Sequence, residues 1–533
     1  MEGSSFGIFW VTTLLKVLLL PHYRSTDFEV HRNWLAITHS LPVSQWYFEA
    51  TSPWTLDYPP FFAWFEYALS LVAARFDPAM LDVANLMYAS PATVLFQRLS
   101  VVATDAVLFL AILHYTRGMS AFSGLKDGDA TGAARQRWIV TLLAFTNPGL
   151  MIVDHIHFQY NGVLLGVFLW SASHIQRGQD LRGALLFAAL LCLKHIFIYA
   201  APAYFVYLLR HYCFDDLYAG TFRGWEQFNA AHADRARPVF RPAKFLLLAA
   251  SVLGVFGAAL GPFLAEGQLK QLLARLFPFD QRGLTHSYWA PNCWVFYNLA
   301  DKVMGRVLRR EGVARMTGGL VEEAGFSVLP RVTPLATLCL VILAMLPALQ
   351  RLWRHPHPRL FLPTVAYCLM CSFMLGWHVH EKAILMVTLP LSMLCLDGLS
   401  ASRLSFFLTA AGTFTLLPLL HQPNETPIKL LLLTTHTLLS WVLLSGEWRG
   451  RQKARRIRFD ALLGFGPLCF LALAAPVQLL VSVVQPLLLT KWAFLPLMAV
   501  SLYGAVANIY AWALCFQQTT HVLRFLDVDD KDG

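Results

Sequence analysis

Charged residues are scarce in this sequence. Only 14% of its 533 residues are Asp, Glu, Lys or Arg, 56% are apolar, and the mean hydropathy is +0.51. Soluble domains carry charge at roughly a quarter of their positions, so this composition excludes an ordinary soluble protein. The net charge of +10 is spread over short loops rather than gathered in one patch, which argues against nucleic-acid binding.

Cysteine is also scarce, with nine residues whose distribution excludes a disulfide framework. Most lie inside apolar runs, where we expect them to pack: Cys192, Cys339, Cys368, Cys371, Cys395, Cys469 and Cys515. Cys368 and Cys371 form a C-x-x-C pair in the middle of such a run. Because no second pair of ligands accompanies them, they do not predict a metal or redox site.

Long apolar runs, in contrast, recur from residue 6 to residue 515. Each is long enough to contribute to crossing a hydrocarbon core of about 30 Å. The sequence therefore predicts an all-α polytopic membrane protein, with one integrated domain over 1–533. The first run has no small-residue cleavage site, so we expect an uncleaved first span. About fourteen transmembrane helices are expected, near 6–21, 94–116, 138–153, 162–176, 183–196, 198–210, 244–265, 333–350, 359–376, 383–398, 404–420, 428–445, 461–485 and 488–515.

Basic residues in the connections predict the orientation, because positively charged loops stay in the cytosol. The basic connections are 117–137, 210–244, 351–359 and 446–458. This orientation requires two short helices within 183–210 and places both termini in the cytosol. Four segments should then meet at one lumenal surface: the first loop 22–93, the turn 154–161, the second large loop 266–332 and the turn 377–382. The sequon at Asn424 lies on the same side, in a short turn near the bilayer, and the sequence leaves its glycosylation open.

The first loop has a high density of acids and aromatic residues. Asp27 follows the first span, and Asp57 precedes two prolines that hold the backbone extended. An acid beside a span is costly unless it is paired or used, so we interpret Asp27 as a general base. Asp27 and Glu29 also have D-x-D spacing, which leaves a metal site as an alternative. The aromatic residues fit a saccharide site and an interfacial aromatic belt equally well.

Three further segments carry polar side chains that could contact a sugar or a lipid phosphate. In DHIHFQYNG, His155 and His157 alternate, so an extended turn would place them on one side. In WHVHEK, His380 and Lys382 lie at the depth of a lipid phosphate, although snorkelling and pairing of Lys382 with Glu381 would also explain the charges. Arg275 and Arg282 lie in the second large loop, and Lys194 ends a predicted span.

Together these motifs show that the chain resembles one known family of enzymes. DFEVHRNW, LPVSQWYFEATSPWTLDYPP, DHIHFQYNG, LKHIFIYAAPAY, RLFPFDQRG and WHVHEKAIL occur in the order seen in endoplasmic-reticulum dolichyl-phosphate-glucose glucosyltransferases. The likeness covers nearly the whole chain, and in 446–533 it depends mostly on topology. Of the family's two members, the chain resembles the second. The Ile in HIHFQYNG and the segment Phe-Phe-Ala-Trp-Phe-Glu after Pro-Pro carry this distinction.

The resemblance implies a GT-C glycosyltransferase fold with lumenal interface helices, and an inverting reaction that needs no metal or other cofactor. The donor would be dolichyl phosphate glucose. The acceptor would be the monoglucosylated nine-mannose oligosaccharide on dolichyl diphosphate, extended through an α-1,3 bond. Asp27 matches the family's general base, Asp57 a second acid, and His380 a histidine at the leaving phosphate. The candidate substrate-binding residues are Asp57, His380, Lys382, His378, Glu29, Arg32, Tyr58, His155, His157, Gln159, Lys194, Arg275 and Arg282.

Two alternatives remain open at this point. One is the sister enzyme that adds the first glucose, or another transferase with a dolichyl-phosphate donor. The other is a polytopic transporter, which would place polar residues near the membrane midplane in matching halves of the chain. Here the polar motifs gather on one predicted face, which favours an enzyme.

Overall fold

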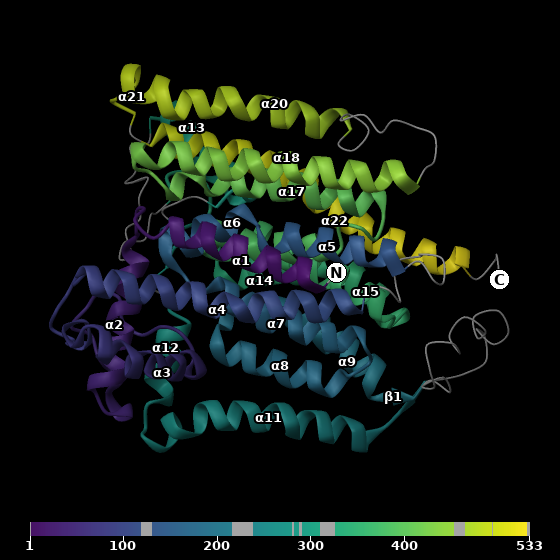
Figure 1. Ribbon diagram of the computed structural model, residues 1–533, viewed down its shortest axis with the longest axis horizontal. Helices are drawn as coiled ribbons and strands as arrows, with labels where there is room; N and C mark the ends of the chain where they lie inside the picture. The colour runs from purple at the N-terminus through teal and green to yellow at the C-terminus, as the bar shows by residue number, and fades with distance from the viewer. Residues whose placement is uncertain are drawn as a thin grey trace.

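The computed structural model describes residues 2–118, 130–215, 238–279, 282–286, 290–309, 326–451, 464–492 and 494–529. Within these ranges the chain forms a bundle of long helices that lie side by side (Figure 1). The helices of the bundle are α1 (Glu2–Leu18), α4 (Pro91–Arg117), α5 (Ala130–Phe145), α6 (Pro148–Leu150), α7 (Asn161–Gln176), α8 (Asp180–Leu193), α9 (Ala201–Tyr212), α11 (Pro242–Ala265), α14 (Pro334–Arg354), α15 (Pro358–Leu375), α16 (Leu385–Met393), α17 (Leu399–Leu416), α18 (Thr426–Arg451), α20 (Phe465–Leu479), α21 (Gln485–Leu488) and α22 (Leu495–Asp529).

Eight helical segments in the described part of the chain are long and apolar enough to cross a membrane. They cover Pro91–Arg117, Ala130–Phe158, Pro242–Ala265, Pro334–Arg354, Pro358–Leu375, Pro423–Arg449, Gly466–Leu488 and Leu495–Thr520. The chain is therefore a multi-pass membrane protein, as its composition predicts. Each of the fourteen expected spans contains a helix, but the number that cross the membrane stays a prediction.

The outer helices present apolar side chains to their surroundings. On α11, at the edge of the bundle in Figure 1, Leu246 and Leu253 are 64% and 68% exposed. In α15, by contrast, nearly all side chains are buried. Lipid replaces water around such a bundle, so an outward apolar face is stable there, while the inner helices pack against one another.

Two short helices occupy the stretch between residues 180 and 212, which confirms the arrangement required by the charge bias. α8 ends at Leu193, a 3-10 turn covers His195–Ala200, and α9 runs from Ala201. After α9, strand β1 (Phe214–Asp215) pairs antiparallel with β2 (Val239–Phe240), with Phe214 opposite Phe240. In Figure 1, β1 lies at the end of the bundle opposite α2 and α3.

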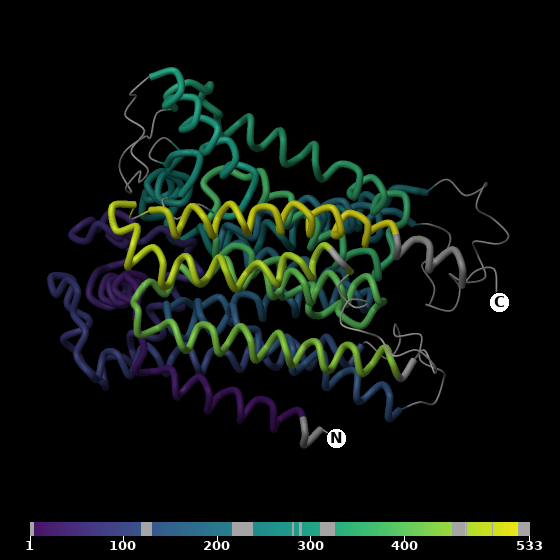
Figure 2. The backbone as a smooth tube through the Cα atoms, turned by 90° about the horizontal axis from the view of Figure 1, so that it is seen from above, coloured from purple at the N-terminus to yellow at the C-terminus, as the bar shows by residue number. Residues whose placement is uncertain are grey.

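Shorter helices gather at the other end of the bundle, which we call the loop end (Figure 1). They are α2 (Thr26–Ser40), α3 (Pro60–Phe76), α12 (Leu269–Leu276) and α13 (Trp294–Val307). α2 begins where it does because the Ser25 hydroxyl accepts a hydrogen bond from the Asp27 amide at 3.1 Å. α3 begins with Pro60, whose missing amide hydrogen costs nothing in a first turn. α1 runs towards the loop end and α22 runs away from it (Figure 2).

Single-turn 3-10 elements complete the loop end. They are η1 (Val43–Gln45), η2 (Pro78–Leu81), η7 (Glu381–Ile384), η8 (Leu417–Leu419) and η9 (Pro423–Glu425). The four segments predicted to share one surface do so in the structure, because side chains from 22–93, 154–161, 266–332 and 377–382 contact one another there, as described below.

The segment expected to be an extended turn after residue 153 is helical instead. A π-helix, η4 (Met151–Phe158), continues from α6, and another π-helix, η10 (Leu480–Val484), joins α20 to α21. Asn147 caps the start of α6, since its side-chain oxygen accepts from the amide of Gly149 at 2.9 Å. Residues two apart on a helix point in different directions. The prediction that His155 and His157 share one side is therefore wrong.

Candidate active site

Asp27 is the carboxylate at which three predicted segments meet. Its Oδ2 accepts hydrogen bonds from Gln159 Nε2 at 2.6 Å and from Lys382 Nζ at 2.8 Å. His157 Nε2 lies 3.3 Å from the same oxygen and 3.2 Å from Lys382 Nζ. Gln159 and Lys382 lie 132 and 355 positions further along the chain than Asp27, and together they hold one of its oxygens in place.

The other carboxylate oxygen of Asp27 remains available. Within the described part of the chain, Oδ1 makes no hydrogen bond, and the side chain is 23% exposed. Burial alone would raise the pKa of Asp27, but attraction to the Lys382 ammonium and contact with His157 outweigh it and hold the pKa well below its usual range. The carboxylate is therefore ionised at neutral pH, with one oxygen ready to accept a proton.

A chain of hydrogen bonds continues from Gln159 towards Lys194. Asn161 donates from Nδ2 to Gln159 Oε1 and to Asp154 Oδ1, both at 2.8 Å. Lys194 Nζ donates to Asn161 Oδ1 at 3.1 Å and lies 5.0 Å from the centre of the Tyr58 ring. The Gln159 amide is thereby oriented with its nitrogen towards Asp27, and Lys194 is brought next to Tyr58.

Asp57 lies on the first loop and pairs with the second large loop. Arg282 Nη2 is 3.3 Å from Asp57 Oδ2, and both side chains are 35% exposed. Burial raises the pKa of Asp57, and attraction to Arg282 offsets this only in part. Arg275 does not pair with Asp57. Its guanidinium donates to Thr55 Oγ1 at 2.8 Å and to the Tyr47 carbonyl at 3.3 Å. It fastens the first loop to α12.

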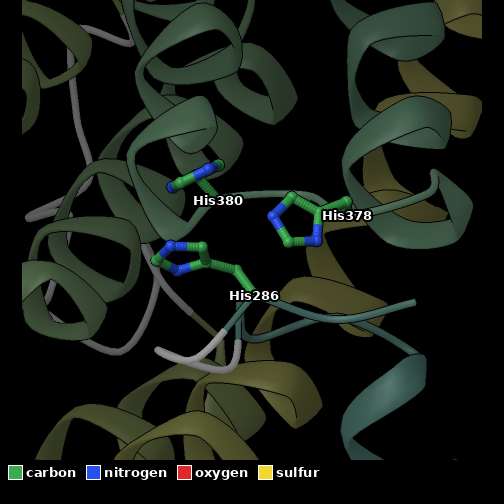
Figure 3. A group of neighbouring side chains, drawn as sticks. All are labelled: His286, His378 and His380. Atoms are coloured by element: carbon green, nitrogen blue, oxygen red, sulfur yellow. The ribbon is translucent and has the colours of Figure 1, made fainter. Parts of the chain in front are cut away.

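Three histidines face a common space beside this cluster (Figure 3). A parallel bridge between Thr285 and Val379 aligns the two segments that carry His286, His378 and His380. The rings of His286 and His380 lie 3.8 Å apart, and His378 Nδ1 lies 2.9 Å from the Gly283 carbonyl. In the described residues this is the group of side chains whose ligand atoms are close enough to hold a metal ion.

Burial keeps these histidines neutral. It is the main cause that lowers the pKa of His378 to about 4, that of His286 to about 3, and that of His380 well below its usual range. Burial also raises the pKa of Glu381 to about 7. A neutral imidazole still donates one hydrogen bond, so His380 can contact a phosphate without carrying charge.

Glu29 and Arg32 pair with each other and do not contact Asp27. Arg32 is fully buried and forms a two-pronged ion pair with Glu29 at 2.7 and 2.8 Å. Its remaining nitrogen donates to the carbonyls of Met80 and Asp82. Both oxygens of Glu29 are occupied, so Glu29 does not share a ligand with Asp27. The pair fastens α2 to η2.

His155 also lies away from the site. Its Nε2 is 2.7 Å from Asp105 Oδ2, which accepts a second bond from Lys16 Nζ at 2.6 Å. All three side chains are buried. The backbone carbonyl of His155 accepts from Arg98 at 2.6 Å. This network holds η4 in position and thereby directs His157, on the other side of η4, towards Asp27.

Two supporting groups at the site are not among the substrate-binding residues that the sequence predicts. Asn161 orients Gln159, and His286 completes the histidine cluster with His378 and His380. Asn161 lies in DHIHFQYNG, and His286 follows shortly after RLFPFDQRG. Their roles depend on contacts between loops, which spacing along the chain does not indicate.

A helical membrane bundle with an ionised carboxylate, oriented amides and basic side chains at the ends of its helices has the arrangement of a GT-C membrane glycosyltransferase. A model described as the "ALG6, ALG8 glycosyltransferase family" matches residues 12–515 of the chain. The chain therefore belongs to the ALG6, ALG8 glycosyltransferase family.

Several similar proteins share the name dolichyl pyrophosphate Glc1Man9GlcNAc2 alpha-1,3-glucosyltransferase. The Mus musculus protein is 46% identical over 517 residues, which cover 94% of this chain and 92% of the relative. The Arabidopsis thaliana protein is 42% identical over 517 residues, covering 95% of each. The Schizosaccharomyces pombe protein is 43% identical over 516 residues, covering 93% and 94%.

Proposed function

We propose that the enzyme transfers glucose from dolichyl phosphate glucose to the monoglucosylated nine-mannose oligosaccharide on dolichyl diphosphate, forming an α-1,3 bond with inversion. The names of its relatives support this acceptor. The observation that carries the chemistry is Asp27, whose Oδ2 is held by three side chains while Oδ1 is left for substrate.

Inversion needs one displacement and one base. The oxygen of the acceptor 3-hydroxyl attacks the anomeric carbon of glucose, while the bond from that carbon to the phosphate oxygen breaks. Its electron pair leaves with dolichyl phosphate. The hydroxyl proton passes to Asp27 Oδ1 as the new bond forms. Gln159, Lys382 and His157 keep the carboxylate plane fixed, which avoids reorganisation during the step.

We assign the leaving phosphate to the side of the Asp27 cluster that carries Lys382 and His380. A phosphate on a dolichol chain stays at headgroup depth, because drawing isoprenoid into water is unfavourable. Lys382 contacts Asp27, and we place it at the same depth as the phosphate. His380 precedes Lys382 by two residues. Positive charge from Lys382 and a hydrogen bond from His380 stabilise the developing phosphate charge in place of a general acid. Lys194 and Arg282 are further cations at this end, near Tyr58 and Asp57.

We assign the protein to the endoplasmic reticulum membrane with the loop end in the lumen. The basic connections support this orientation, because the helix ends beside them lie at the end of the bundle opposite α2 and α3. No metal or other cofactor takes part in the proposed step.

A reconstitution assay tests the function. Purified enzyme in lipid receives labelled dolichyl phosphate glucose with either the unglucosylated nine-mannose acceptor or its monoglucosylated form. We expect transfer to the monoglucosylated acceptor and little to the other. Preferential transfer to the unglucosylated acceptor would identify the enzyme as adding the first glucose instead.

A further inference from the structure

A cavity of about 710 Å³ opens at the loop end beside Asp27. We call it the 422–425 cavity. Its walls come from the turn between α1 and α2, from the segment before α4, and from the turn before α18. Thr26 and Phe28, the residues on either side of Asp27, both line it. Its size lies within the range of about 300–1,000 Å³ typical of small-molecule sites.

Hydrogen bonds join two walls of the cavity, the turn between α1 and α2 and the turn before α18, so this part of its shape exists before any ligand arrives. Glu425 accepts a hydrogen bond from the Tyr23 amide at 2.8 Å, and its other oxygen lies 3.1 Å from His22 Nδ1. Arg98 donates to the Tyr23 carbonyl at 2.7 Å and also to the His155 carbonyl. A site formed in advance loses less entropy when it binds.

The polar groups that line the cavity suit a neutral, hydroxyl-rich ligand. Gln422 and Asn424 are exposed, and their side chains make no hydrogen bond to any residue in the described ranges. An amide offers two donors and an acceptor to sugar hydroxyls. Arg24, which stands 5.4 Å from the Phe28 ring centre, is exposed and adds one cation. Two carboxylates line the cavity, and both already have partners: Glu425 binds His22 and Tyr23, and Glu29 binds Arg32. A phosphate site would need more positive charge.

We propose that the 422–425 cavity binds neutral sugars of the acceptor oligosaccharide, next to the unit whose hydroxyl reaches Asp27. This proposal depends on the proposed function for the identity of the ligand. The reacting sugar must contact Asp27 Oδ1, and Thr26 and Phe28, from the same helical turn as Asp27, line the cavity. Sugars beyond the reacting unit then fall between Gln422, Asn424 and Arg24, which would let the enzyme select its acceptor by more than the terminal residue.

Asn424, which lines the cavity, is also the acceptor residue of an Asn-x-Thr sequon. A glycan on Asn424 would fill the cavity that the acceptor needs. Active enzyme should therefore carry no glycan there. Thr426→Val removes the sequon without changing a lining residue, so neither Thr426→Val nor Asn424→Ala should alter the electrophoretic mobility of enzyme isolated from its native membrane. A mobility shift in both variants, in enzyme that remains active, would overturn the proposal.

Kinetics test the site directly. Gln422→Ala, Asn424→Ala and Arg24→Ala should each raise the KM for the lipid-linked acceptor by about 3- to 10-fold, the effect of one lost hydrogen bond. The KM for dolichyl phosphate glucose should change by less than about twofold, because the three side chains contact the acceptor and not the donor. Thr426→Val is the matched control for Asn424→Ala, and Lys270→Ala, on exposed α12 surface, is the general control. Unchanged acceptor KM in all three cavity variants would refute the proposal while leaving the proposed function intact.

A binding measurement separates failure of the cavity from failure of the proposed function. The monoglucosylated nine-mannose oligosaccharide, released from its lipid, is titrated into the purified full-length enzyme without donor, and binding heat is recorded. We expect binding that weakens in Gln422→Ala and Asn424→Ala but not in Lys270→Ala. If the enzyme transfers no glucose yet binds the glycan in this pattern, the cavity assignment stands and the reaction is wrong. Binding equal in wild type and cavity variants would place the glycan elsewhere.

Discussion

Replacing Asp27 by Asn tests the central step, because it removes the base while keeping the shape of the side chain. The amide oxygen can still accept from Lys382 and Gln159, which now bond Oδ2 at 2.8 and 2.6 Å. The variant should therefore fold and bind donor. A general base contributes about 10²- to 10⁴-fold to the rate, or about 2.7–5.4 kcal/mol in the barrier. We expect kcat to fall by that factor.

A positioning role for Asp27 would have a much smaller effect. A hydrogen bond to a charged group contributes about 1.5–3 kcal/mol and a neutral one about 0.5–1.5 kcal/mol. Losing the charge on Asp27 would then weaken its hold on Lys382 by about 1 kcal/mol, or about fivefold in rate. A loss of more than a hundredfold is therefore too large for positioning alone.

The assay is single-turnover transfer from labelled donor in enzyme whose folding is checked by size-exclusion chromatography. Asp57→Asn is the matched control, since Asp57 is held only by a 3.3 Å contact with Arg282. We expect it to keep much of its kcat. Asp27→Asn with turnover within tenfold of wild type would refute the assignment. If Asp57→Asn were inactive instead, Asp57 would be the base, consistent with its raised pKa.

Four further predictions concern the surrounding groups. His380→Ala should weaken donor use by about 10- to 150-fold in kcat/KM, while His378→Ala should do less because its Nδ1 is engaged by the Gly283 carbonyl; equal effects would contradict this. Lys382→Met removes the attraction that lowers the pKa of Asp27, so this pKa rises, and the acid limb of the kcat/KM profile should move to higher pH. EDTA should leave turnover unchanged, and a loss restored by Zn²⁺, Mn²⁺ or Mg²⁺ would assign a metal to the histidine cluster or to Asp27. Arg32→Met leaves Glu29 buried without its partner and should destabilise the fold by about 3–5 kcal/mol, seen as a lower Tm with little change in kcat of the folded fraction.

The residues of the first loop show how far sequence reasoning reached. Asp27 and Lys382 were both selected by their place beside apolar runs, and the structure brings them within 2.8 Å. Glu29 and Arg32, polar residues of the same first loop, were also candidates, yet they pair with each other in the interior. Proximity to a span identifies polar residues that need a partner. It does not say whether that partner is substrate or another side chain.

The sequence by itself determined the membrane class, the positions of the helices and the family, because apolar runs, charge bias and motif order are properties of the chain alone. Only the tertiary structure decided which side chains share the site. His155 and His157 are equivalent in the sequence pattern. The helical backbone of η4, held by Arg98 and by the buried Lys16, Asp105 and His155 network, turns one towards Asp105 and the other towards Asp27. The direction of a side chain depends on backbone geometry and on contacts across the fold, and neither is encoded in local spacing.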